Sequence, residues 1–268
     1  MPLFTFNFKM NTSARISALL IALFILCSTF LAMFPLNKME TKSYLMGAID
    51  NTARLENSKM DSKRLILLGG SSLGWSVSAK NISTKLGIHT VNLGVHAGIG
   101  YESIKKIYIE YLEPTRDIIV LSPEIGMVLS SHTFFTKEYC QVLRLQRAMS
   151  LDAIFCAPTN LYSLAKTIYE QAKTSEGDDY SRYGFNEFGD YIKHYGIHDR
   201  LFIGSTEAAD TIDIEKSHDK LVKYNDFVDG LRNQGFRVLF IPPILAASEC
   251  TDSNQIFRFY RYIAANAE

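Results

Sequence analysis

Residues 65–76 read LILLGGSSLGWS, and this stretch bears on both the fold class and the function. Four apolar residues run into Gly69 and Gly70 and then into Ser71 and Ser72, after which a helix is predicted. A short apolar run that ends at glycines is typical of a buried strand. Glycines and hydroxyls at the tip of such a strand have three explanations: a nucleophile, a phosphate cradle, or an ordinary turn whose serines cap the next helix.

The rest of the chain alternates predicted strands with predicted helices. Strands are predicted over 64–69, 89–94, 116–124 and 235–244, and helices over 78–87, 101–114, 137–149, 160–174, 215–234 and 253–268. Apolar strands separated by helices indicate a parallel sheet with helices on both faces, a three-layer α/β/α fold. Ligands of such folds bind at the carboxyl ends of the strands, where Ser71, the loop 92–98 and Glu124 follow the first three strands.

The N-terminal region differs from an ordinary soluble domain. Residues 16–36 carry no charge and have the length needed to cross a bilayer as a helix. A cleaved signal peptide is the alternative, but the apolar run is longer than such peptides usually have and lacks a small-residue cleavage site. We expect a cytoplasmic segment 1–15, a transmembrane anchor 16–36, a juxtamembrane stalk 37–62 and an α/β domain over 63–268. The predicted location is therefore the inner or plasma membrane, with a single-pass anchor and an extracytoplasmic domain.

The composition excludes one class of partner and leaves the cysteines open. Lys and Arg number 28 and Asp and Glu also number 28, so no net charge favours a nucleic acid partner. We expect no metal and no cofactor. Cys140 and Cys156 could pair in an extracytoplasmic domain, leaving Cys250 free, or all three could be buried thiols.

A second glycine-rich loop separates the three explanations of the Gly-Gly-Ser-Ser turn. The stretch lacks the spacing of a phosphate-binding loop, and no lysine follows it. An ordinary turn explains the local residues but not NLGVHAGIG, residues 92–100, which is expected at the same edge of the sheet. A nucleophile explains both loops, because backbone N–H groups of the second loop could stabilise the oxyanion that forms when a serine attacks a carbonyl.

These motifs resemble those of the SGNH (GDSL-like) esterases. LGGSSLG, residues 68–74, is similar to their first block, and VNLGVHAGIG, residues 91–100, looks like their second. Residues 64–125 and YGFNEFGDYIKH, residues 183–194, also resemble a group with functions in envelope polysaccharides. The resemblance implies that Ser71 is the nucleophile and that Gly94 or Gly98 joins its N–H in the oxyanion hole. It makes Ser72, Asn92 and His96 candidates for substrate binding, and Ser72 is the fallback nucleophile.

The chain departs from the SGNH pattern at three places. Gly70 stands where these enzymes usually have Asp, and Glu124 stands where a third block would bring Asn. No D-x-x-H motif occurs downstream of Ile241, so the Asp-His pair that would activate the serine is missing. We therefore expect the domain to be incomplete at its C-terminus, with an apolar sheet edge open to a protein partner.

Two groups of histidines are candidates to replace the missing base. His96 lies in the second loop, at the same edge as Ser71, and is the best placed. Asp190, His194, His198 and Asp199 form a cluster in sequence that resembles a metal or acid–base site, but its spacing fits no zinc site. A solvated surface segment near the mouth of the active site explains it better.

Two functions follow from these residues and motifs. The first is a membrane-anchored SGNH-like serine esterase or O-acyltransferase that acts on acyl groups of an envelope polysaccharide through an acyl-Ser71. The alternative is a catalytically inactive SGNH-like scaffold for binding or assembly in the cell envelope. The sequence leaves open whether the protein is an enzyme.

Overall fold

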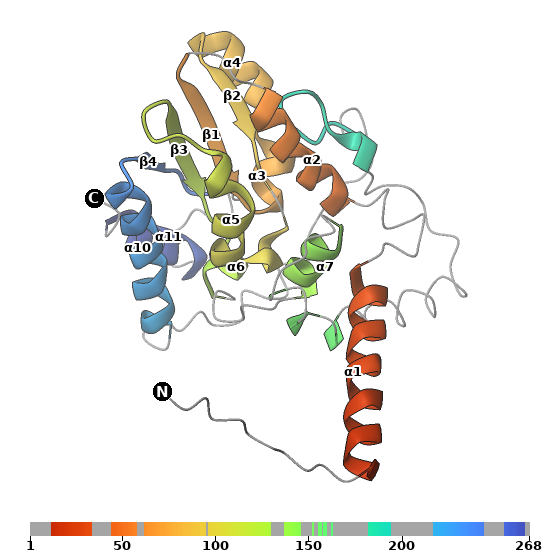
Figure 1. Ribbon diagram of the computed structural model, residues 1–268. Coiled ribbons are helices and arrows are strands. Elements are labelled where there is room, and N and C mark those ends of the chain that lie inside the picture. The colour runs from red at the N-terminus through yellow and green to blue at the C-terminus, as the bar shows by residue number, and fades with distance from the viewer. Residues whose placement is uncertain are drawn as a thin grey trace, which may run out of the picture.

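The computed structural model describes residues 12–33, 44–57, 62–94, 96–129, 137–145, 182–193, 217–243 and 255–265, with six single positions between 152 and 162. Their centre is a parallel sheet of four strands in the order β2-β1-β3-β4 (Figure 1). The strands are β1 (Arg64–Gly69), β2 (His89–Asn92), β3 (Asp117–Ser122) and β4 (Arg237–Phe240). Each lies within one of the four predicted strand ranges, so the α/β class with a parallel sheet is confirmed.

Helices connect and flank the strands. The described helices of the domain are α2 (Tyr44–Asn57), α3 (Ser71–Ser76), α4 (Ala79–Leu86), α5 (Tyr101–Tyr108), α6 (Ile125–Leu129), α7 (Lys137–Leu145), α10 (His218–Asn233) and α11 (Gln255–Ala265), with short 3-10 turns η2 (Ala97–Ile99), η3 (Ile109–Tyr111) and η4 (Arg182–Gly184). Local sequence explains α4, because the Ser78 side chain accepts from the Asn81 N–H and Gly87 ends the helix at φ 65°. The predicted helix 160–174 lies outside the described residues, apart from Tyr162.

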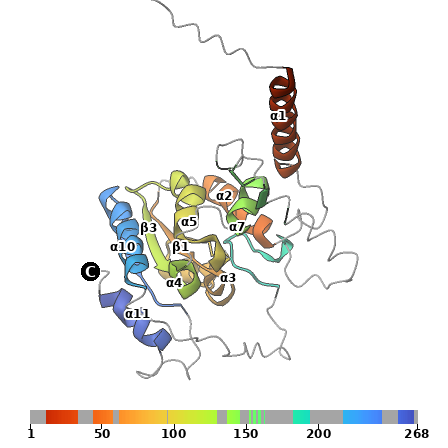
Figure 2. The same ribbon diagram turned by 90° about the horizontal axis from the view of Figure 1, so that it is seen from below.

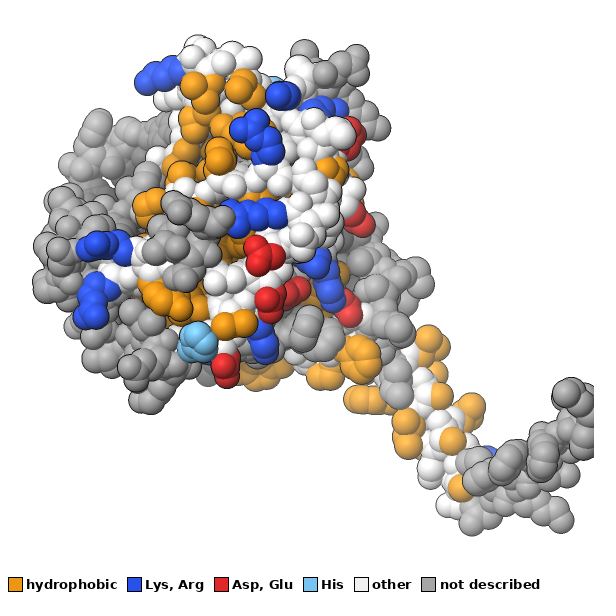
Figure 3. All heavy atoms as spheres, turned by 90° about the vertical axis from the view of Figure 1, so that its left-hand side faces the viewer, with side chains coloured by type: hydrophobic (Ala, Val, Ile, Leu, Met, Phe, Trp, Pro, Cys, Tyr) orange, Lys and Arg blue, Asp and Glu red, His pale blue; other side chains and the backbone are white. Residues whose placement is uncertain are grey.

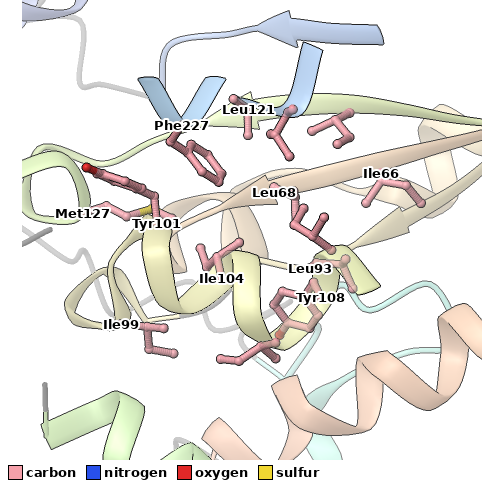
Figure 4. Close-up of a cluster of buried hydrophobic side chains, with 14 of the residues drawn as sticks. Ile66, Leu68, Leu93, Ile99, Tyr101, Ile104, Tyr108, Leu121, Met127 and Phe227 are labelled. Carbon is pink, nitrogen blue, oxygen red and sulfur yellow. The ribbon is translucent and has the colours of Figure 1, made fainter. Parts of the chain in front are cut away.

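Alternate residues of each inner strand face opposite sides of the sheet. Ile66 and Leu68 of β1 join the large core with α5 and α10, shown in Figure 4. Leu67 of β1 joins a smaller cluster on the other side, with Leu73 of α3 and Ala79 of α4. The sheet is therefore covered on both faces, and Figure 2 shows α3 and α4 near β1 and α10 beside α11.

Helix α2 forms part of the domain as the structure has it, although the sequence predicts a stalk over its residues. Leu45, Ile49 and Leu55 are buried in the large core, and Asn51 is fully buried. The Asn51 side chain donates to the backbone oxygen of Asn92 at the end of β2, at 3.1 Å. The run 44–49 carries no polar side chain but the Tyr44 hydroxyl, and mostly polar residues follow it, so no apolar face repeats along the whole helix in the sequence.

A buried ion pair fixes the amino end of the sheet. Arg64 of β1 donates to both carboxylate oxygens of Asp117 of β3, at 2.7 and 2.6 Å, and both side chains are fully buried. The same guanidinium donates to the backbone oxygen of Leu55 at 2.8 Å, so it also holds the end of α2 against the sheet.

The cysteines at 140 and 156 form a disulfide, which resolves the alternatives left open by the sequence. Cys140 lies on α7, and both sulfurs belong to fully buried residues. The bridge ties α7 to the residues around 152–156, where Asp152 accepts hydrogen bonds from Tyr139 and Lys106. These two hydrogen bonds lower the pKa of Asp152, and burial together with the bond to Asp152 raises the pKa of Tyr139.

The N-terminal helix α1 (Thr12–Met33) points away from the domain in Figures 1 and 2. Large apolar side chains between Ile16 and Leu26 are more than half exposed, and they line the projecting rod in Figure 3. Within the described residues, no helix meets both the length and the hydropathy of a membrane span. Residues 34–36 of the predicted anchor lie outside the described part of the chain.

Strand β4 is the outermost strand of the described sheet on the side opposite β2. Leu239 is 48% exposed and Ile241, just beyond the strand, is 37% exposed. An incomplete sheet edge that binds a protein partner stays a prediction.

Candidate functional site

Three loops meet at the carboxyl edge of the sheet. Gly70 and α3 follow β1, the loop that contains η2 follows β2, and Glu124 and α6 follow β3. Since β1 lies between β2 and β3, the chain leaves β1 toward one side of the sheet and crosses to the other side to form β3. The crevice between the ends of β1 and β3 is therefore a topological switch point, which is where open parallel sheets bind ligands.

Ser71 and Glu124 face each other across this crevice. The Ser71 hydroxyl donates to Oε1 of Glu124 at 3.5 Å, and the backbone N–H of Ser72 donates to the same oxygen at 2.6 Å. Gly70 makes this approach possible, because a Cβ built there would lie 2.3 Å from Oε1. The Glu124 carboxylate thus occupies the space beside Gly70 and caps the first turn of α3 from a neighbouring strand.

The two adjacent serines differ in what their hydroxyl groups contact. Ser71 is partly buried, and its hydroxyl contacts the Glu124 carboxylate. The hydroxyl oxygen of Ser72 is buried and has no hydrogen-bond partner among the described residues. Of the two predicted candidates, Ser71 is therefore the one whose hydroxyl is presented at the switch point.

The backbone N–H groups predicted for the oxyanion hole both make hydrogen bonds within their own loop. The Gly94 N–H donates to Oδ1 of Asn92 at 2.9 Å, and the Gly98 N–H donates to Nδ1 of His96 at 3.1 Å. An oxyanion would have to replace these acceptors. The assignment of Gly94 and Gly98 to an oxyanion hole stays a prediction.

His96 lies at the carboxyl edge, as expected, and is exposed. Its Nδ1 accepts from Gly98, so in the neutral ring Nε2 carries the proton. Among the described residues, the Ser71 hydroxyl contacts a carboxylate and no imidazole. The sequence predicts only that the loop of His96 lies at the same edge of the sheet as Ser71. The structure shows no hydrogen bond between these two described residues.

Asn92 is fully buried and holds the loops together. Its side-chain amide donates to the backbone oxygens of Leu73 and Val77, at 3.2 and 3.0 Å, and to Oδ1 of Asp190 at 3.2 Å. With the bond from Gly94, all of its polar atoms have partners inside the protein. These contacts position α3 beside β2, and a contact with substrate stays a prediction.

Asp190 caps helix α4 from a distant segment. Its carboxylate accepts from the backbone N–H groups of Ala79 and Lys80, at 2.7 and 3.2 Å, and it is fully buried. The residues that neighbour it in the sequence cluster, His194, His198 and Asp199, lie outside the described residues. In the part of the chain that the structure describes, no group of three His, Cys, Asp or Glu residues could hold a metal ion.

Residues 182–193 form a strap along the outer edge of β2. The Asn92 N–H donates to the Phe188 oxygen at 2.8 Å, and the Tyr191 N–H donates to the Gly74 oxygen at 2.9 Å. Tyr191 stacks on Trp75 of α3, with ring centroids 4.8 Å apart, and also contacts Tyr44 of α2 edge-on. The strap therefore holds the first two loops of the site in place.

Sequence reasoning missed the contact of Glu124 with Ser71 and the packing of the strap on β2 and α3. In the sequence, Glu124 follows the third strand and stands where an Asn donor would be, and no catalytic role is predicted for it. Two features of the sequence together could have identified the contact of Glu124 with Ser71. Gly70 has no side chain, and a carboxylate stands at the end of the neighbouring strand, where it can fill that space.

Comparison of the chain with protein-family models, with curated proteins and with solved structures finds no match. The resemblance to the SGNH esterases therefore stays a prediction.

Proposed function

We propose that this protein is a membrane-anchored SGNH-like serine esterase or O-acyltransferase that acts on acyl groups of an envelope polysaccharide through an acyl-Ser71 intermediate. One observation carries the proposal. The Ser71 hydroxyl lies at the turn between β1 and α3, at the switch point of a parallel sheet, in contact with a carboxylate. A hydroxyl in this position is accessible from the carboxyl edge, where ligands of such sheets bind.

The chemistry would proceed by acyl transfer to serine. The Ser71 oxygen attacks the acyl carbonyl, and the sugar oxygen leaves, which forms an acyl-enzyme. Backbone N–H groups of Ser71, Gly94 and Gly98 are the candidate donors to the tetrahedral oxyanion. Water then releases the acyl group in an esterase, whereas a sugar hydroxyl accepts it in a transferase.

The location of the protein is proposed from α1 and the disulfide. The exposed apolar side chains between Ile16 and Leu26 support an anchor over residues 16–36. The disulfide between Cys140 and Cys156 supports an extracytoplasmic domain, because such bonds persist in oxidising compartments. The polysaccharide substrate follows from the SGNH resemblance and the anchor.

Labelling with a fluorophosphonate tests the nucleophile. We expect the full chain in detergent to be labelled, Ser72→Ala to be labelled as well, and Ser71→Ala to lose the label, with circular dichroism showing that all three are folded. A label that persists in Ser71→Ala would contradict the assignment of Ser71.

Membrane extraction tests the anchor separately. The full chain should remain in the membrane pellet after alkaline carbonate treatment, and a chain that starts at residue 37 should be released. Release of the full chain would contradict the anchor but not the assignment of Ser71.

A catalytically inactive scaffold is the second candidate. It is favoured by the bonds that the Gly94 and Gly98 N–H groups already make with Asn92 and His96. For the scaffold we expect a folded chain that is not labelled but binds acylated polysaccharide in a pull-down assay.

A further inference from the structure

We propose that Glu124 is the general base that activates Ser71. This inference rests on the proposed function. The Ser71 hydroxyl donates to Oε1 of Glu124. Among the described residues, no other titratable side chain accepts a hydrogen bond from this hydroxyl. A serine becomes an effective nucleophile when an adjacent group accepts its proton, and a carboxylate can take this role.

The position of the carboxylate depends on the tertiary fold. Ser71 and Glu124 are 53 residues apart in the chain, but parallel pairing sets Gly69 beside Ser122, so the residues just beyond both strands meet. Gly70 leaves the space that the carboxylate occupies, 2.3 Å from where a Cβ would be. A glycine at position 70 and a carboxylate at position 124 therefore fit together as one arrangement.

The proton and the bonds balance through both halves of the reaction. In acylation, the hydroxyl proton of Ser71 moves to Oε1 of Glu124 as the Ser71 oxygen bonds to the acyl carbon. Glu124 then gives this proton to the leaving alkoxide as the acyl C–O bond breaks. In deacylation, water or a sugar hydroxyl gives its proton to Glu124 and bonds to the acyl carbon, and the Ser71 oxygen takes the proton back as its acyl bond breaks.

A merely structural role for Glu124 can be separated from this chemical role. Oε1 also accepts from the Ser72 N–H at 2.6 Å, which caps α3. The amide oxygen of a glutamine could accept that bond equally well, but an amide cannot take a proton from Ser71. Glu124→Gln should therefore leave the melting temperature nearly unchanged and lower the rate of acylation.

Gly70→Ala keeps the Glu124 carboxylate but should displace it from Ser71. The added methyl would meet the far end of the flexible Glu124 side chain, which can turn away from Ser71. Gly126→Ala is the matched control on the loop of Glu124, because a Cβ there has Ala97 Cβ 3.9 Å away as its nearest neighbour. His96→Gln tests the histidine that its position in the sequence makes the best-placed replacement for the missing base, although substrate binding is the role predicted for it.

The experiment measures the rate of fluorophosphonate labelling and of p-nitrophenyl acetate hydrolysis in the full chain and these four variants. We expect Glu124→Gln and Gly70→Ala to lower both rates by about 10²–10⁴-fold, the range that general bases contribute. Gly126→Ala should stay within a few-fold of the parent. If Glu124→Gln unfolds, Gly70→Ala decides the question.

The outcomes distinguish this inference from the proposed function. Labelling that needs Ser71 but is unchanged in Glu124→Gln would overturn the role of Glu124 and leave the esterase or transferase in place. A loss of labelling in His96→Gln but not in Glu124→Gln would do the same. A folded parent chain that is not labelled at all would overturn both.

Discussion

Asn92 donates its side-chain amide to the carboxylate of Asp190, 3.2 Å away, although the two residues are 98 positions apart in the chain. Asn92 ends the edge strand β2, and Asp190 lies in the strap formed by residues 182–193. Asp190 also caps helix α4 through the N–H of Ala79. The Asp190 carboxylate therefore connects the strap to both the edge strand β2 and helix α4. The support of the second loop of the site therefore comes from a distant part of the chain.

Removing the Asp190 carboxylate should destabilise the domain. Asp190→Ala leaves the N–H groups of Ala79 and Lys80 without their acceptor and removes one of the three acceptors of the Asn92 amide. We expect this loss to lower the free energy of unfolding by about 1–3 kcal/mol. Urea unfolding followed by circular dichroism measures the loss. Glu187→Ala, at an exposed carboxylate of the same strap, is the control, and an equal effect of both variants would contradict the prediction.

Two glycines with positive φ should respond differently to alanine. Gly189 has φ 84°, and a Cβ there would lie 2.2 Å from the backbone oxygen of Asn92, which cannot turn away. Gly87 has φ 65° with open space around its Cβ position. Gly87→Ala should cost about 1–2 kcal/mol for the left-handed conformation alone, and Gly189→Ala should cost clearly more. Equal midpoints of urea unfolding in the two variants would show that the strap is not packed as described.

The disulfide should contribute measurably to stability. Cys140 and Cys156 are 16 residues apart, and closing a loop of about this size is worth about 3 kcal/mol in the chain-entropy estimate. The double variant Cys140→Ser with Cys156→Ser should melt at a lower temperature than the parent. A reductant should lower the melting temperature of the parent but not that of the double variant. Cys250→Ser is the control. A parent chain that is insensitive to the reductant under unfolding conditions would contradict the bridge.

His89 should make the stability of the domain depend on pH. Burial, and to a lesser degree the charge of Arg64, lower the pKa of His89 below its usual value of 6.5. The unfolded chain then takes up the proton first as the pH falls, so the contribution of His89 is complete above about pH 6.5 and declines below it. His89→Gln should flatten the decline in melting temperature just below about pH 6.5. An unchanged slope in the variant would assign the decline to other groups.

Local sequence was sufficient for the four described strands, for helix α4 and for the position of Ser71 after β1. The apolar run 65–68 and the glycines after it specify a buried strand and a turn, and Ser78 and Gly87 specify the two ends of α4. These features depend on backbone preferences and hydrogen bonds over a few residues, so they can be recognised without knowing what else is nearby.

The partners of Ser71 and Asn92 could not be found in the same way. Glu124 reaches Ser71 because β1 and β3 pair in parallel, and Asp190 reaches α4 because the strap runs along β2. Neither position carries a local pattern that indicates its contact, since each contact is set by strand order and by side-chain packing between segments 53 and 111 residues apart. The chain therefore encodes the serine turn locally, whereas the carboxylate beside it is placed by the tertiary fold.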